Sequence, residues 1–276
     1  MSSGAETIEL PRLAAPGRVT QARVAFSEWT KFVSLRSTRW SLGVGILLTI
    51  APPILVAAVV TSQWAHMSAV ERAQQHPLDI ALGGLNVAQL AIAVLGVLVI
   101  SGEYSTGLIR STLMAVPKRL PVLWAKIAVS AAVSFVLLVP ALLIGFFASQ
   151  SILRGDHILQ LSFSAPGVTR SLLGGVLYVM LVGVFALALG AIVRHTAGAI
   201  SAFVGIFFVL PQLVTLLPAS WNNAISEHLP SDAGQQLCAL HQGAHSLSPL
   251  QGGLLMLAYC AAAVAAAAVL LVRRDA

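Results

Sequence analysis

The chain has 276 residues, of which 57% are hydrophobic and only 9% are charged, whereas a soluble domain usually carries about 25% charged residues. Its mean hydropathy is +0.87. These values exclude a water-soluble globule and a disordered chain, and the two cysteines, Cys238 and Cys260, are too few for a disulfide scaffold. The composition predicts an integral membrane protein.

Residues 1–20 are polar and contain no apolar stretch of the kind found in a cleavable signal peptide. We expect them to form a disordered cytoplasmic tail, followed by one transmembrane domain over residues 21–276. The domain begins with a pattern typical of a helix lying in the membrane interface, because aromatic and apolar residues share one stripe and Lys31 lies on the opposite side. The residues that define this interfacial helix are Phe26, Trp29, Lys31, Val33 and Trp40. The alternative is an ordinary anchor beside the membrane.

Six long stretches without Asp, Glu, Lys or Arg each hold the roughly 20 residues that a helix needs to cross a bilayer. Their continuous apolar character excludes a β-barrel. A single helix over residues 171–217 would be about 70 Å long, so the chain must turn at Arg194. The sequence therefore predicts an all-α protein with six transmembrane helices. The predicted spans are about 41–62, 80–101, 125–148, 171–193, 196–217 and 250–272.

The basic residues predict the orientation of these spans. If the N-terminus is cytoplasmic, only Arg72, Arg154 and Arg170 of the 16 Lys and Arg residues lie on the outer side. Cytoplasmic loops carry the excess of basic residues. We therefore expect a multi-pass protein of the cell membrane with both termini in the cytoplasm. The net charge of +6 follows from this topology, and no nucleic-acid partner is needed to explain it.

Prolines within the spans, at Pro52, Pro53, Pro140 and Pro211, predict helix kinks. The outer segment over residues 218–249 is moderately apolar, and we expect it to pack as short helices. It also contains five residues of types that bind metals, but this pattern is more typical of polar loop residues than of a metal site. They are His228, Asp232, Cys238, His241 and His245.

Motifs for enzymatic chemistry are missing from the sequence. It contains neither a metalloprotease nor an intramembrane serine-protease motif, and no lysine follows a glycine as in a phosphate-binding loop. We therefore expect no catalytic residue, no metal and no cofactor in this chain. The predicted spans have Asn86, Gln89 and Gln212 but no charge near their centres, which counts against a carrier driven by protons or sodium.

The most informative segment lies between the second and third spans, over residues 101–119. We expect Ser105 to cap a short amphipathic helix, whose stripe includes Leu108 and Leu113 and which ends at Pro117. Such a helix fits a groove on another protein, and Glu103 and Arg110 are expected to face the cytoplasm or that partner. The alternative is a segment that only ends the span. The candidate residues are Glu103, Tyr104, Leu108, Arg110 and Leu113.

The sequence resembles the permease subunits of type-2 ATP-binding-cassette (ABC) exporters over about residues 20–276. The resemblance rests mainly on Gly102-Glu103-Tyr104-Ser105-Thr106-Gly107-Leu108-Ile109-Arg110, on the Pro117-Lys118-Arg119 exit with Lys126, and on Ser27-Glu28-Trp29-Thr30-Lys31. The turn at Arg194-His195-Thr196-Ala197-Gly198 and the stretch Leu229-Pro230-Ser231-Asp232-Ala233-Gly234 add to it.

The resemblance implies that the interfacial helix is an elbow and that the segment after the second span is a coupling helix. The coupling helix would contact a separate ATPase subunit, which binds ATP and magnesium. Two permease subunits, either two copies or this chain with a homologue, and two ATPases would move an amphipathic or lipid-like substrate outward. Residues 218–249 would form short re-entrant helices. A non-transporting resistance or immunity protein, a membrane enzyme and a secondary carrier remain as alternatives.

Overall fold

The computed structural model describes residues 20–115, 119–155, 161–240 and 246–273, and within them all regular structure is helical. The elements in chain order are α1 (Gln21–Ser34), α2 (Arg36–Gln63), η1 (Trp64–His66), α3 (Ala69–Ala73), α4 (Pro77–Ser105), α5 (Leu108–Ala115), α6 (Leu120–Gly155), α7 (Val168–Val193), α8 (Thr196–Val204), η2 (Gly205–Val209), α9 (Leu210–Val214), α10 (Ala219–Ser226), α11 (Pro230–Gln235) and α12 (Pro249–Arg273). The predicted disordered tail, except for Thr20, lies outside the described residues.

The six predicted spans are confirmed as helical segments that are long and apolar enough to cross a membrane. Five of them extend further than predicted, because the helices continue past the apolar runs into flanking sequence. The fifth ends at Val214, three residues earlier than predicted. The segments are Arg36–His66, Pro77–Thr106, Leu120–Gly155, Val168–Val193, Thr196–Val214 and Pro249–Arg273.

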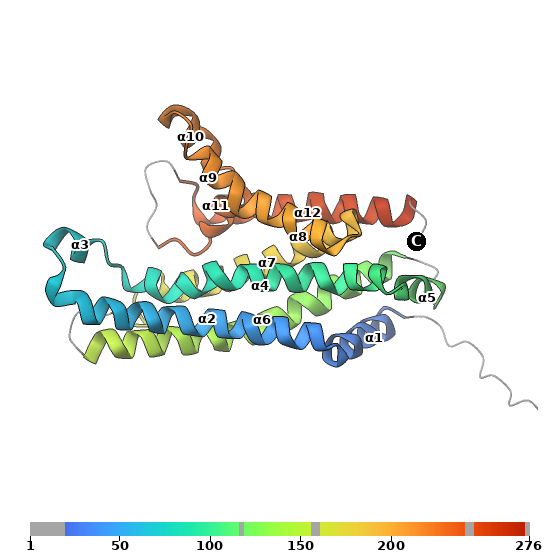
Figure 1. The fold of residues 1–276 in the computed structure, drawn as a ribbon, viewed down its shortest axis with the longest axis horizontal. Coiled ribbons are helices and arrows are strands. Elements are labelled where there is room, and N and C mark those ends of the chain that lie inside the picture. The colour runs from blue at the N-terminus through green and yellow to red at the C-terminus, as the bar shows by residue number, and fades with distance from the viewer. Residues whose placement is uncertain (1–19, 116–118, 156–160, 241–245, 274–276) are drawn as a thin grey trace, which may run out of the picture.

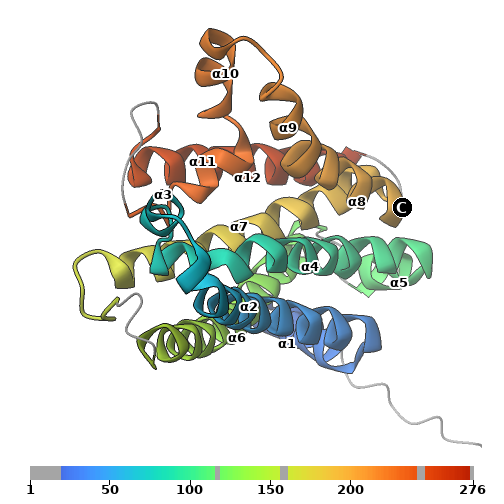
Figure 2. The ribbon, with the colours of Figure 1, turned by 60° about the vertical axis from the view of Figure 1, so that its left-hand side comes forward.

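The helices lie side by side and define two ends of the molecule (Figure 1). One end, called the α5 end below, holds α1, α5 and the C-terminal end of α12. The other, called the α10 end, holds α3 and the short helices between α9 and α12. Figure 2 shows α9 and α10 projecting from the body of the bundle, while α11 lies against α12. Residues 219–235 therefore form two short helices, as predicted.

The interfacial stripe is broken between α1 and α2, which corrects one sequence prediction. Leu35 has extended backbone angles (φ −75°, ψ 126°) and separates the two helices. Trp40 therefore belongs to the first spanning helix and not to the interfacial helix. On α1 itself, Phe26 is 71% exposed and Trp29 and Val33 are about half exposed. These three side chains of α1 thus point away from the bundle, whereas Phe32 is 5% exposed and packs into the core.

The predicted turn at Arg194 is confirmed. Arg194 has a left-handed backbone (φ 57°) and its N–H donates to the carbonyl of Gly190, which ends α7. His195 then caps α8, because its Nδ1 accepts from the N–H of Gly198 at 3.2 Å. Further along this span, the π-helical turn η2 ends two residues before the predicted kink site at Pro211.

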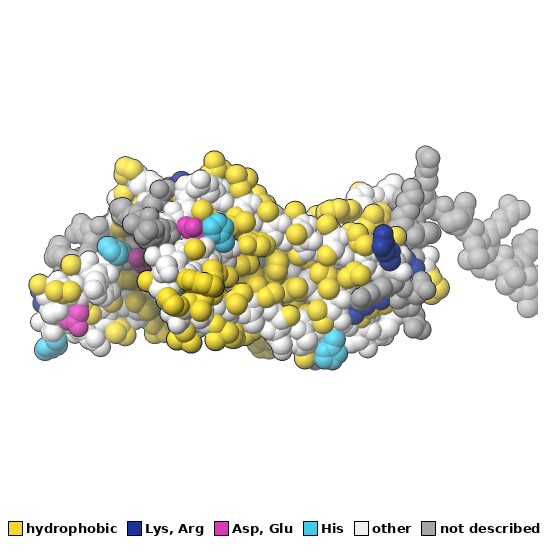
Figure 3. Space-filling view, turned by 90° about the horizontal axis from the view of Figure 1, so that it is seen from above, with side chains coloured by type: hydrophobic (Ala, Val, Ile, Leu, Met, Phe, Trp, Pro, Cys, Tyr) yellow, Lys and Arg dark blue, Asp and Glu magenta, His cyan; other side chains and the backbone are white. Residues whose placement is uncertain are grey.

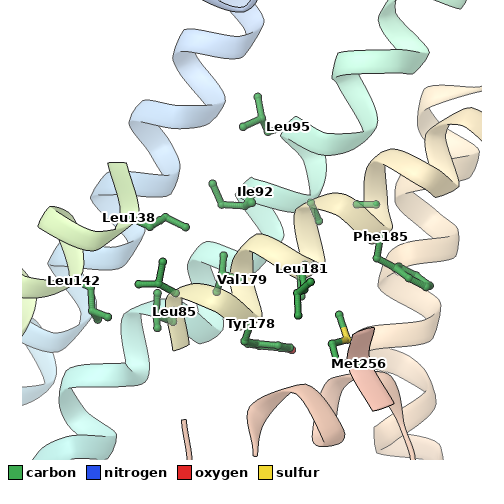
Figure 4. Close-up of a cluster of buried hydrophobic side chains, with 14 of the residues drawn as sticks. Leu85, Ile92, Leu95, Leu138, Leu142, Tyr178, Val179, Leu181, Phe185 and Met256 are labelled. Atoms are coloured by element: carbon green, nitrogen blue, oxygen red, sulfur yellow. The ribbon is translucent and has the colours of Figure 1, made fainter. Parts of the chain in front are cut away.

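The core forms where α4 and α7 pack against each other and against α2, α6 and α12. Figure 4 shows Ile92 of α4, Tyr178 and Phe185 of α7, Leu138 of α6 and Met256 of α12 in the main buried cluster. The contact between α4 and α7 is close because of Gly96, where a Cβ would lie only 2.3 Å from the carbonyl oxygen of Gly183. Small residues thus bring the two most buried spans together.

Two neighbouring glycines of α4 provide a test of this packing. A Cβ at Gly84 would lie 2.3 Å from the carbonyl oxygen of Thr49 on α2, whereas a Cβ at Gly83 would meet nothing within 4 Å. We expect Gly84→Ala to destabilise the protein by about 1–3 kcal/mol through overpacking. Gly83→Ala, the matched control, should be neutral or stabilising. Unfolding in detergent measures both, and equal effects would contradict the close α2–α4 contact.

Candidate functional site

Four charged side chains from three helices meet at the α5 end. They are Glu28 and Lys31 of α1, Glu103 of α4 and Lys126 of α6, called the charged cluster below. Three of them are almost completely buried: Lys126 is 1% exposed, Glu28 4% and Glu103 6%. The side chain of Lys31 remains one-third exposed.

Each lysine of the charged cluster contacts both glutamates. The Nζ atom of Lys126 lies 2.6 Å from Oε2 of Glu28 and 2.7 Å from Oε1 of Glu103. The Nζ atom of Lys31 lies 2.8 Å from Oε1 of Glu28 and 2.8 Å from Oε1 of Glu103. Lys126 also donates to the carbonyl of Val99 at 3.2 Å. The positive and negative charges therefore alternate in a closed ring.

The balance of charge explains how this cluster can be buried. Two ammonium and two carboxylate groups have no net charge, and each ammonium donates to two carboxylates, which offsets part of the cost of removing them from water. Burial alone would lower the pKa of Lys31, but its hydrogen bonds to Glu103 and Glu28 and the attraction of their negative charges together outweigh burial and raise that pKa. Lys31 therefore stays charged at neutral pH and ties α1 to α4.

Helix α5 is attached to the same cluster. Gly107 has a positive φ of 73°, which lets the chain turn sharply between α4 and α5. The Nζ atom of Lys31 donates to the hydroxyl of Thr112 on α5 at 3.3 Å. The predicted cap at Ser105 is wrong: Ser105 is the last residue of α4, and its hydroxyl donates to the carbonyl of Gly102 at 3.0 Å.

The predicted short helix between the second and third spans is confirmed as α5. Its apolar residues do not all lie on one side, because some are buried and others are exposed. Ile109 is 4% exposed and packs inward, whereas Leu108 is 54% and Met114 78% exposed. Leu108 and Met114 are thus the exposed apolar residues among the described side chains of α5. The side chains of the candidate residues Arg110 and Leu113 lie outside the described part of the structure, as do residues 116–118.

The structure places Glu103 and Tyr104 inside the bundle. The prediction that Glu103 faces the cytoplasm or a partner is wrong, because Glu103 is 6% exposed and its carboxylate accepts from both ammonium groups of the charged cluster. Tyr104 is half-buried, and the guanidinium carbon of Arg194 lies 5.0 Å from its ring centroid, within the range of a cation–π contact. Glu103 and Tyr104 therefore link α4 to its neighbours.

Sequence reasoning missed Glu28 and Lys126 as site residues. Glu28 stands three residues before Lys31 on α1, a spacing that places both on one side of a helix, and that was the available signal. Lys126 directly follows Ala125 in an apolar run, and its sequence position suggests only the edge of a span. Their meeting depends on the tertiary packing of α1 against α6, which hydropathy does not encode.

The metal-site pattern of the outer segment gains no support from the described residues, in which no group of three or more His, Cys, Asp or Glu side chains is placed to hold a metal. His241 and His245 lie outside the described part. Burial raises the pKa of Cys238 to about 11, so this thiol is protonated at neutral pH and is a poor metal ligand in that form.

The distribution of side chains on the surface agrees with the class of protein that the helices define. On the face shown in Figure 3, hydrophobic side chains cover the middle of the molecule, and Lys and Arg side chains gather at the α5 end. The protein is a multi-pass helical membrane protein. No protein-family model matches the chain, and a comparison with curated proteins finds no relative.

Proposed function

We propose that this protein is the permease subunit of an ATP-driven exporter and that the exposed face of α5 binds a separate ATPase subunit. The observation that supports this function best is the combination of exposed apolar side chains on α5, Leu108 and Met114, with a buried charged cluster to which α5 is hydrogen-bonded. A helix that only connects two spans needs neither an exposed apolar face nor a rigid attachment. A helix that transmits movement from a partner needs both.

The charged cluster supplies the path for such movement. A partner that displaces α5 also displaces Thr112, whose hydroxyl is hydrogen-bonded to Lys31 of α1. Lys31 shares both glutamates with Lys126 of α6, and Glu103 belongs to α4. Each charged group of the cluster lies within 3 Å of a group of opposite charge. We therefore expect α1, α4 and α6 to shift together when α5 shifts.

The proposed working unit follows from the resemblance described above. A second copy of the permease or a homologue pairs with this chain, two ATPase subunits bind ATP and magnesium, and an amphipathic or lipid-like substrate moves outward. In this arrangement the α5 end faces the cytoplasm, where ATP is available. The excess of Lys and Arg in the segments at this end supports that orientation.

The energy source tests this proposal. The chain purified alone is expected to hydrolyse no ATP, whereas vesicles containing it with its ATPase should transport substrate only when ATP is supplied. Transport should continue after the proton gradient is collapsed, because the described spans carry their charged groups near their ends. Transport that follows the gradient and ignores ATP would contradict the proposal and favour a secondary carrier.

A further inference from the structure

A groove opens on the surface of the bundle at the α10 end, between the first turns of α7 and α12 and the segment that follows α11. Its volume is about 680 Å³. Leucines form most of its lining, and one arginine lies at its edge. The residues that define this groove are Arg170, Leu173, Leu177, Leu237, Leu240 and Leu250.

The groove depends on a glycine of α7. Residues 170, 173, 174 and 177 lie on one face of that helix, three or four positions apart. A Cβ at Gly174 would lie 2.0 Å from the carbonyl oxygen of Leu237, so only glycine lets the segment after α11 lie directly against α7. That segment forms one wall of the groove, and the exposed side chains of Leu173 and Leu250 border its open side.

Arg170 lies at the edge of the groove and contacts the segment after α11. Its Nη2 atom donates to the carbonyl oxygen of Ala239 at 2.6 Å, which uses one of the five N–H groups of the guanidinium. The residue is otherwise exposed, and among the described residues no acidic side chain forms an ion pair with it. The remaining donors are therefore available to an anion from outside the chain.

The position of the groove along the spans indicates what kind of anion this is. Arg170 is the third residue of α7 and Leu250 the second of α12, so the groove begins where two membrane-spanning helices begin. Its apolar lining continues along α7 toward Leu177, into the depth of the hydrocarbon layer. Arginine near the end of a span places its charge at the level of the lipid headgroups.

We propose that this groove binds one phospholipid, with its phosphate on Arg170 and an acyl chain along the leucines. A phosphate accepts two parallel hydrogen bonds from a guanidinium, and the apolar lining matches the attached chain. Both parts are needed, because neither a free phosphate nor a neutral lipid satisfies the arginine and the leucines together. This site is separate from the charged cluster and does not depend on the proposed transport function.

Native mass spectrometry of the purified protein in neutral detergent tests the proposal, with phosphatidylglycerol as the probe. We expect one tightly bound lipid per chain. Arg170→Gln should weaken its binding by about tenfold or more, the loss expected when a charged hydrogen bond is removed. Arg154→Gln, which changes another arginine of the α10 end that does not line the groove, should leave binding unchanged.

Three further comparisons distinguish a bound phospholipid from other occupants of the groove. Diacylglycerol with the same chains should bind more weakly than phosphatidylglycerol, and inorganic phosphate should not displace the lipid. Leu177→Trp, which fills the groove, should lower the binding of both lipids.

The proposal is overturned if Arg170→Gln and Arg154→Gln bind the lipid equally, or if phosphate alone competes. It is also overturned if Leu177→Trp changes the oligomeric state and leaves lipid binding intact, since the groove would then contact a second copy.

Discussion

Replacing Lys126 with methionine is expected to destabilise the protein by about 3–5 kcal/mol, because it removes one partner from a buried ionic arrangement. Lys126 is 1% exposed and its ammonium lies within 2.7 Å of both Glu28 and Glu103. Methionine fills a similar volume but leaves two buried carboxylates with one ammonium between them. Unfolding of the purified protein in detergent measures the loss.

Two other variants control for simple loss of packing. Adding Glu103→Gln to Lys126→Met restores a neutral cluster, so the double variant should recover part of the lost stability. Lys31→Met should cost less than Lys126→Met, because the side chain of Lys31 is one-third exposed and water can reach the groups it leaves. The assignment of the charged cluster fails if Lys31→Met and Lys126→Met cost the same and the double variant recovers nothing.

The second large effect is expected at the exposed face of α5. Leu108→Asp should insert and fold normally, because Leu108 is 54% exposed in the isolated chain. Once an ATPase groove covers it, the aspartate becomes an unpaired charge in an apolar contact, which costs several kcal/mol. We therefore expect binding of the ATPase to fall by about 100-fold or more and transport to stop.

A substitution at the opposite end of the molecule provides the matched control. Leu216 lies between α9 and α10 and is 80% exposed, so Leu216→Asp introduces the same charge on a leucine that is also exposed. It should bind the ATPase as the unchanged protein does. Pull-down with the ATPase, after membrane levels have been matched, measures both variants. Normal binding and transport by a well-inserted Leu108→Asp protein would remove α5 from the mechanism.

The architecture was predictable from the sequence because it depends on hydrophobicity alone. Six apolar runs gave six spans, and the length of the run interrupted at Arg194 required a turn there. The break at Leu35 was not predictable, since the apolar stripe of α1 continues through it to Trp40. The start of α5 was predicted at the wrong residue, because a serine such as Ser105 is equally compatible with the end of one helix and the start of the next.

The candidate site was predicted only in part. The amphipathic pattern after Glu103 located the short helix, because helical periodicity is a local property. The charged cluster is not local: Glu28, Glu103 and Lys126 are separated by 75 and 23 positions in the chain. Glu103 was therefore expected to face outward, as an isolated charged residue at the end of a span usually does. Only the packing of α1 against α6, together with the contact between Lys31 and Glu103, shows that it is buried.

The measurement that most directly tests binding of an ATPase at the α5 end is site-specific photocrosslinking in cells. A photoreactive amino acid is placed at Met114 of α5, which is 78% exposed, and in a second protein at Leu216, which is 80% exposed at the α10 end. Crosslinked products are isolated and tested for labelling by a photoreactive ATP analogue. We expect an ATP-binding protein joined at position 114 and none at position 216. The absence of an ATP-binding product at position 114, or the same product at both positions, would contradict the account.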